Sequence, residues 1–151
     1  WYVPHIAYEG PTLPEEGLEV FSSAYPLLVG MDTSEETMVY SMVKIMHQHF
    51  DEYKDNAPGA TGWLLERQKF DQAFLPFHPG AIRYYKEIGA WNEAADAQNL
   101  LNLDRQRVLM DAWAAFFPTA PEGYAEFEAA WMRARNSALE AEGLITLGEG
   151  L

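Results

Sequence analysis

The sequence contains no cysteine, which excludes disulfide bonds, thiol nucleophiles and thiolate metal ligands. Basic residues are also scarce, because 10 Lys and Arg residues stand against 23 Asp and Glu residues and give a formal net charge of −13. A chain of this charge repels phosphate backbones and anionic lipid, so no nucleic-acid partner is expected. No apolar run reaches the roughly 18 residues that a membrane-spanning helix requires.

What the chain does have is apolar and aromatic content. Hydrophobic residues make up 48% and aromatic residues 14% of the 151 residues, which is too much for a disordered tail and enough for one buried core. Helical periodicity recurs along most of the sequence, and helix is predicted for roughly 60% of it, well above the usual third.

The first part of the chain is rich in proline and glycine, and only short extended segments are predicted there, around Trp1–Tyr8 and Leu18–Val20. The apolar run Ala24–Met31 is short enough for a buried strand, although Pro26 confines it to a strand start or a sheet edge.

Three helices are predicted next. Thr33 and Glu36 have the spacing of a capping box, and an apolar stripe follows to about Lys54. The second helix is expected over Trp63–Ala73. The third is expected over Pro79–Glu87, with His78 just outside it as a cap and Gly89 as a left-handed stop.

Two long segments rich in Ala, Leu and Glu follow, and they predict an antiparallel αα-hairpin over roughly Glu93–Phe117 and Pro121–Glu142. Thr119 and Glu122 have capping-box spacing before the second helix, and Gly143 would end it. The predicted contact joins two stripes of residues: Tyr124, Phe127, Trp131, Ala134 and Ala138 against Leu101, Val108, Ala112, Trp113 and Phe116.

Residues that could carry chemistry form no recognisable catalytic or metal motif. His47 and Asp51 lie four residues apart on the first helix, which predicts a solvated ion pair, with a metal site as the minor alternative. Adjacent acidic pairs such as Glu15–Glu16 are interpreted as solvated surface groups. No phosphate-binding loop or nucleophile elbow is present, so we expect a binding protein without catalytic residues, metal or cofactor. The enzyme alternative requires two carboxylates, or a histidine and a carboxylate, that converge in a pocket.

One longer pattern is more specific. The segment FLPFHPGAIRYYKEIGAW, preceded by the apolar run AYPLLVGMD and a helix containing VYSMVKIMHQHFDEYK, resembles the end of the TAXI-family solute receptors of TRAP transporters. The resemblance covers about 90 of the 151 residues. The matching positions are Pro76, His78, Pro79, Gly80, Ala81, Tyr84, Tyr85, Glu87 and Gly89.

This resemblance implies the C-terminal portion of a type II periplasmic-binding-protein fold (α/β, though helix-dominated here) over residues 1–91, with residues 92–151 as an appended helical hairpin and tail. It implies an extracytoplasmic, periplasmic receptor that captures a small organic carboxylate and delivers it to a membrane permease. Tyr8 and Tyr25 would be nearest the ligand, and each hydroxyl could donate to a carboxylate; a packed tyrosine remote from the ligand is the alternative for each. Such receptors are about twice this length, so we expect a fragment.

The alternative from another class is a free-standing helical interaction module, in which the hairpin that carries Trp113 and Trp131 mediates dimerisation or contacts a partner. Self-association is expected under either hypothesis, because a half-receptor would leave apolar surface uncovered.

Overall fold

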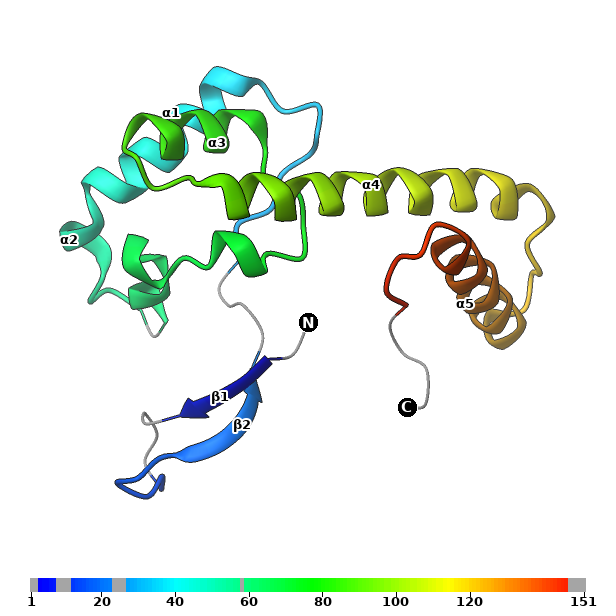
Figure 1. Cartoon of the computed structure of the whole chain (residues 1–151), viewed down its shortest axis with the longest axis horizontal. Coiled ribbons are helices and arrows are strands. Elements are labelled where there is room, and N and C mark those ends of the chain that lie inside the picture. The colour runs from blue at the N-terminus through cyan, green and yellow to red at the C-terminus, as the bar shows by residue number, and fades with distance from the viewer. Residues whose placement is uncertain (1–2, 8–11, 23–26, 58, 147–151) are drawn as a thin grey trace.

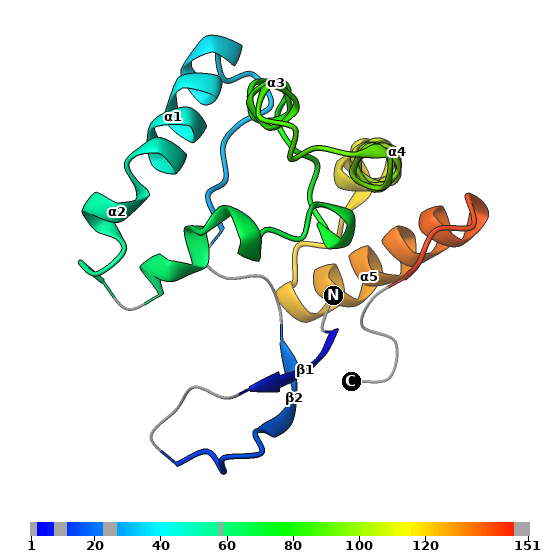
Figure 2. The same ribbon diagram turned by 60° about the vertical axis from the view of Figure 1, so that its left-hand side comes forward.

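The computed structural model describes residues 3–7, 12–22, 27–57 and 59–146. A hairpin opens this part of the chain: strand β1 (Val3–Ala7) pairs antiparallel with β2 (Leu18–Ser22), and His5 lies opposite Val20. Figure 1 and Figure 2 both show this hairpin projecting away from the helices. The two extended segments expected from the sequence are confirmed as this pair of strands.

The rest of the described chain is mostly helical. Its α-helices are α1 (Glu36–Gln48), α2 (Phe50–Tyr53), α3 (Pro79–Glu87), α4 (Glu93–Phe116) and α5 (Tyr124–Ala141). The 3-10 helices are η1 (Ala60–Trp63), η2 (Leu65–Arg67), η3 (Phe70–Gln72) and η4 (Phe117–Thr119). Within the described ranges, no helix combines the length and the apolar composition needed to cross a membrane.

The dominance of helix agrees with expectation, but the expected type II periplasmic-binding-protein fold is wrong. The sheet of the described chain consists of β1 and β2 alone, whereas that α/β fold requires larger sheets. The apolar run predicted as a strand is described from Leu27 to Met31, where it forms no strand, and Val29 and Met31 are 68% and 71% exposed. An apolar run becomes a strand only beside a partner to which its backbone can hydrogen-bond, and no such partner lies beside these residues in the described chain.

Two predicted helix starts differ from the structure because another residue caps the helix. The carboxylate of Glu35 accepts a hydrogen bond from the amide of Met38 at 2.7 Å, so α1 begins at Glu36 rather than after Thr33. Helix α5 begins after Gly123, because the Thr119 hydroxyl donates back to the carbonyl of Phe116 instead of capping the following turn.

The helix predicted over Trp63–Ala73 is replaced by the 3-10 helices η1, η2 and η3, joined by extended residues. The side-chain amide of Gln68 donates to the carbonyls of Gly62 and Leu64 at 2.9 and 3.1 Å. These bonds satisfy carbonyls that a continuous helix would have paired with backbone amides, and they hold the chain in its irregular path.

An aromatic cluster in the helical body packs η3 and the segment before α3 against the residues that link α3 to α4. Phe70, Phe77 and Trp91 pack with ring centroids 5.2 to 5.6 Å apart. Two buried asparagines of α4 hold the segment before α3: Asn99 accepts from the amide of Phe77 at 2.7 Å, and Asn102 donates to the carbonyls of residues 73 and 75. Because buried polar groups must be paired, these bonds fix the position of the segment against α4.

Helices α4 and α5 pack through aromatic side chains. Trp113 meets Trp131 with centroids 4.9 Å apart, and Phe116 meets Phe127 at 5.4 Å, as the predicted stripes require. Tyr124 and Leu101 are exceptions, since they are 83% and 55% exposed. Figure 2 looks nearly along α4 and shows α5 lying across it, so the two helices are not antiparallel. The connection between the helices, residues 117–123, is a 3-10 turn followed by a loop, and it is longer than the link that the predicted bounds Phe117 and Pro121 would leave.

Candidate functional site

The candidate site is built on the close packing of α1 against α3. Gly80, in the first turn of α3, makes this approach feasible: a Cβ there would overlap the carbonyl oxygen of Glu36 and lie 2.8 Å from the amide nitrogen of Tyr40. His78 caps α3, as predicted, because its Nδ1 accepts from the amide of Gly80 at 3.1 Å. The other ring nitrogen contacts the carbonyl of Ser34 at 3.1 Å and so ties the cap to the segment before α1.

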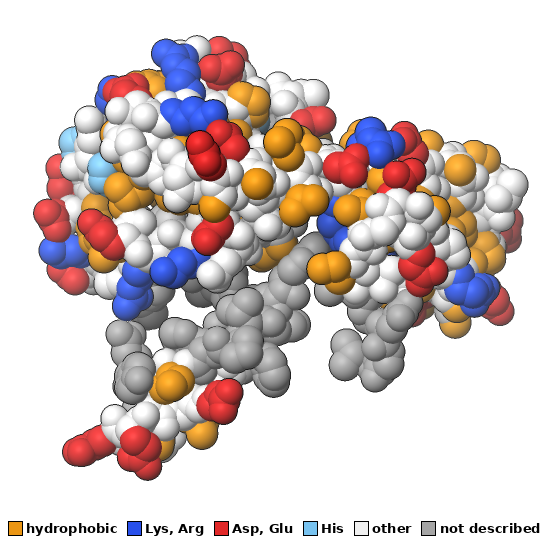
Figure 3. Space-filling model, viewed as in Figure 1, with side chains coloured by type: hydrophobic (Ala, Val, Ile, Leu, Met, Phe, Trp, Pro, Cys, Tyr) orange, Lys and Arg blue, Asp and Glu red, His pale blue; other side chains and the backbone are white. Residues whose placement is uncertain are grey.

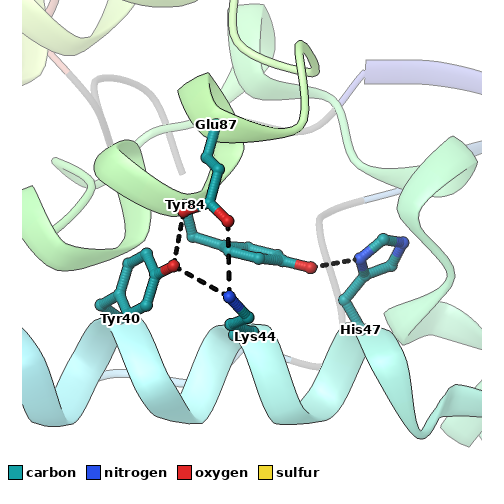
Figure 4. A network of polar contacts seen from close by, with 5 residues as sticks. All are labelled: Tyr40, Lys44, His47, Tyr84 and Glu87. Atoms are coloured by element: carbon teal, nitrogen blue, oxygen red, sulfur yellow. Dashed lines mark hydrogen bonds and ion pairs between the residues drawn. The ribbon is translucent and has the colours of Figure 1, made fainter.

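A polar network crosses the α1–α3 interface (Figure 4). The hydroxyl of Tyr40 donates to Glu87 Oε2 at 2.5 Å, and Lys44 Nζ lies 3.1 Å from the same hydroxyl and 3.4 Å from Glu87 Oε1. The bond from Tyr40 lowers the pKa of Glu87, with a further contribution from Lys44, and contact with Tyr40 and then Glu87 raises the pKa of Lys44. The arrangement therefore keeps a carboxylate and an ammonium ion together at the surface end of the interface.

One turn further along α1, His47 approaches the hydroxyl of Tyr84, with 2.7 Å between Nδ1 and the phenolic oxygen. Tyr84 is 2% exposed, and burial raises the pKa of its hydroxyl. The sequence-based pairing of His47 with Asp51 is wrong, since Asp51 instead accepts from Lys54 at 2.6 Å. This phenol–imidazole contact positions the His47 ring at the edge of a cleft.

The cleft lies between the C-terminal end of α1, the α2 turn and the segment containing η1 and η2. We refer to it as the His47 cleft; its volume is about 430 Å³, and its lining residues are His47, Phe50, Asp51, Lys54, Trp63, Leu64, Leu65 and Glu66. Figure 3 shows histidine atoms at the surface of the helical body beside apolar and acidic groups. The volume falls within the usual range for small-molecule sites.

The chemistry available in the His47 cleft is that of a binding site for a small polar molecule. Lys54 supplies a cation, whose pKa is raised chiefly by its bond to Asp51, while His47 supplies a ring nitrogen that can donate or accept. Phe50 and Trp63 supply apolar walls. A carboxylate could accept from Lys54 while the body of the ligand packs on the aromatic rings.

The ligand-contacting residues expected from the resemblance, Tyr8 and Tyr25, lie outside the described residues. Among the other histidines, His49 contacts Glu52 at 2.7 Å on the surface, and His5 belongs to strand β1. In the described part of the chain, no three His, Asp or Glu side chains come together in a group that could hold a metal ion.

Sequence reasoning missed the two contacts on which the site depends, Tyr40–Glu87 and His47–Tyr84. Their partners are 47 and 37 residues apart in the chain, so no local spacing could have paired them. The only signal was indirect, because Tyr84 and Glu87 belong to the Tyr-Tyr-x-Glu-x-Gly pattern singled out as distinctive.

Comparison with known families places this site within a recognised segment. Residues 22–89 match the NMT1-like family. This is an extracytoplasmic solute-binding-like family, so the coarser part of the resemblance is confirmed for these residues. The matched segment spans fewer than half of the 151 residues and contains every residue that lines the His47 cleft. The NMT1-like match ends before α4, and no curated protein and no solved structure matches the chain.

Proposed function

We propose that the protein is a periplasmic solute receptor of a TRAP-type transporter, similar to the TAXI family, which captures a small organic carboxylate and delivers it to a membrane permease. The observation that carries the proposal is the match of residues 22–89 to an extracytoplasmic solute-binding-like family, together with the cleft that this segment encloses. In this proposal the protein binds its ligand without transforming it.

Within the His47 cleft, Lys54 is the proposed partner of the ligand carboxylate, and Trp63 is the proposed apolar wall. The location of Lys54 supports this role: it is half-buried at the edge of the cleft, and its existing bond to Asp51 keeps its ammonium group in place. Tyr8 and Tyr25 remain proposed as additional donors to the carboxylate.

The experiment is a thermal-shift screen of the 151-residue chain against dicarboxylates, keto acids and acidic amino acids, followed by calorimetric titration of any hit. A ligand that binds only the folded state raises the melting temperature by mass action. Lys54→Gln should weaken binding of the hit by about tenfold or more, the usual loss for one charge-assisted hydrogen bond. Y8F and Y25F test the two tyrosines in the same titration.

The matched control is Lys86→Gln, because Lys86 lies on α3 outside the cleft, 52% exposed and paired with Asp96 at 3.2 Å. Its substitution should leave the affinity unchanged. A panel without any hit would contradict the proposed function, and an equal loss of affinity in both variants would contradict the assignment of Lys54.

A further inference from the structure

Helix α4 carries an apolar stripe that the described part of the chain leaves uncovered. Large apolar side chains along it are between 45% and 65% exposed: Leu100, Leu103, Met110 and, at the C-cap of the helix, Phe117. The NMT1-like match ends at residue 89, so this surface lies outside the matched segment. Contiguous exposed apolar side chains of this size are typical of a surface that binds another protein.

The spacing of the stripe is that of a coiled-coil interface. Two further exposed residues, Arg107 and Ala114, complete a pattern in which steps of three and four residues alternate. We call this set of residues the α4 seam: Leu100, Leu103, Arg107, Met110, Ala114 and Phe117. Helices with this pattern pack by inserting the side chains of one seam between those of the other. Leu101 is 55% exposed on the same helix but does not belong to the seam.

We propose that the α4 seam binds the α4 seam of a second copy of this chain in the antiparallel direction and so forms a symmetric dimer. A contact between identical surfaces must be complementary to itself. The order of side chains along α4 meets this condition, because antiparallel pairing gives every member of the seam a counterpart. The facing pairs are Leu100 with Phe117, Leu103 with Ala114 and Arg107 with Met110 of the second copy.

Arg107 determines the direction of pairing. In a parallel pair identical positions face each other, so the two Arg107 side chains would meet and repel. In the antiparallel pair each Arg107 lies opposite Met110 of the second copy and beside its Asp111, so unlike charges come together. On its own helix Arg107 bonds to Asp104 at 2.7 Å and lies 3.5 Å from Asp111, so its charge is already balanced where it enters the seam.

The charge of the whole chain opposes this association. Two chains that each carry a net charge of −13 repel one another, and the apolar contact of the seams has to overcome this repulsion. Salt screens the repulsion but not the apolar contact, so the dimer should become more stable as salt is added. The inference does not rest on the proposed function, because α4 lies wholly outside residues 22–89.

The first test is sedimentation equilibrium of the 151-residue chain over a range of protein and salt concentrations. The parent chain should form a dimer whose dissociation constant falls as salt is added. Leu103→Glu should raise this constant about a hundredfold or more, because symmetry removes a leucine from both copies and places two carboxylates in the seam. Leu101→Glu is the matched control, since it makes the same change on the same helix outside the seam, and its dissociation constant should stay close to that of the parent.

A variant that strengthens the dimer separates the proposal from simple damage to the fold. Arg107→Leu completes the apolar seam and should lower the dissociation constant by about tenfold or more. A monomeric parent chain at every concentration and salt, equal effects of Leu103→Glu and Leu101→Glu, or a weaker dimer with Arg107→Leu would each overturn the proposal.

The direction of pairing can be read from disulfide formation, because the chain has no cysteine of its own. An equimolar mixture of Leu103→Cys and Ala114→Cys chains, oxidised with diamide, should cross-link one variant to the other. Leu103→Cys alone should not cross-link, since the two substituted positions lie far apart in the antiparallel pair. Cross-linking of Leu103→Cys to itself but not to Ala114→Cys would overturn the antiparallel arrangement.

Discussion

The packing of α1 on α3 makes a sharp prediction for Gly80→Ala. A methyl group at this position would overlap the carbonyl oxygen of Glu36 and lie 2.8 Å from the amide nitrogen of Tyr40 and 3.1 Å from Cβ of Val39. Two of these three obstacles are backbone atoms of α1, and they cannot turn aside as a flexible side chain would. The helices must therefore separate, which disturbs the Tyr40–Glu87 bond across the same interface.

The size of the effect follows from two opposing contributions. Overpacking of a tight interface costs about 1–3 kcal/mol, and rigid backbone obstacles favour the upper end of that range. Replacing a helical glycine by alanine returns about 0.5–1 kcal/mol of helix propensity. We therefore expect Gly80→Ala to lower the free energy of unfolding by about 2 kcal/mol, which for a chain of this size is a fall of about 4–8 °C in melting temperature.

The assay is thermal and urea denaturation followed by circular dichroism, with two other glycines as controls. Among the described residues, an alanine Cβ at Gly30 would meet Ser34 Oγ alone, at 3.5 Å, so the substitution should change the free energy of unfolding by no more than about 0.5 kcal/mol. Gly89 has a φ of +71°, and an added Cβ there would meet no described residue within 4 Å, so Gly89→Ala should cost about 1 kcal/mol through backbone conformation. Stability of Gly80→Ala equal to that of the parent chain would refute the steric reasoning.

Three further predictions concern other parts of the molecule. Because the bond from Tyr40 lowers the pKa of Glu87, the ionised carboxylate stabilises the fold above its ordinary pKa, and this stabilisation is lost as the pH falls. In urea titrations at a series of pH values, the free energy of unfolding of Glu87→Gln should therefore fall less steeply with acid than that of the parent chain. An unchanged pH dependence would contradict the assignment. Burial raises the pKa of Tyr85 to about 12, so the neutral phenol contributes its full stabilisation of the fold below pH 10, and this is lost as the pH rises towards 12. Tyrosinate absorbance and denaturation together can follow this loss. Ionisation of all tyrosines near pH 10 would contradict the prediction. Trp131→Ala should lower the free energy of unfolding, measured with urea, by about 2 kcal/mol or more. Tyr124→Ala, at an 83% exposed position of the same helix, should lower it by less than about 0.5 kcal/mol. Similar losses in the two variants would mean that the aromatic contact does not hold α5.

The features that could be predicted from the sequence are those governed by neighbouring residues. Helix α3 has the predicted bounds Pro79–Glu87, because proline at the first position, the His78 cap and Gly89 at positive φ are all local determinants. The start of the long helix at Glu93 was also predicted correctly, and in the structure Asn92 caps this helix by accepting from the amide of Ala95 at 2.9 Å.

The features that could not be predicted depend on partners distant in the sequence. The run Leu27–Met31 has strand-like composition, but composition does not supply a neighbouring strand. Likewise, His47 has an acidic residue four positions away, yet the buried hydroxyl of Tyr84 is its partner, because α3 brings that hydroxyl within 2.7 Å. Local spacing ranked the surface pairing first, whereas tertiary packing determined the actual contact.

Electrostatics connects the His47 cleft to the character of the whole chain. A net charge of −13 repels an anionic solute at distances up to about one Debye length, roughly 10 Å at 0.1 M salt. Capture of a carboxylate by such a protein must therefore depend on short-range bonds to individual cations rather than on long-range attraction. Lys54 is the cation that lines the His47 cleft, where Asp51 and Glu66 also lie, so a direct bond to Lys54 rather than the summed charge of the cleft would hold the carboxylate. Because salt screens the long-range repulsion more strongly than the contact within a cleft, added salt should accelerate the association of a carboxylate with little effect on its dissociation.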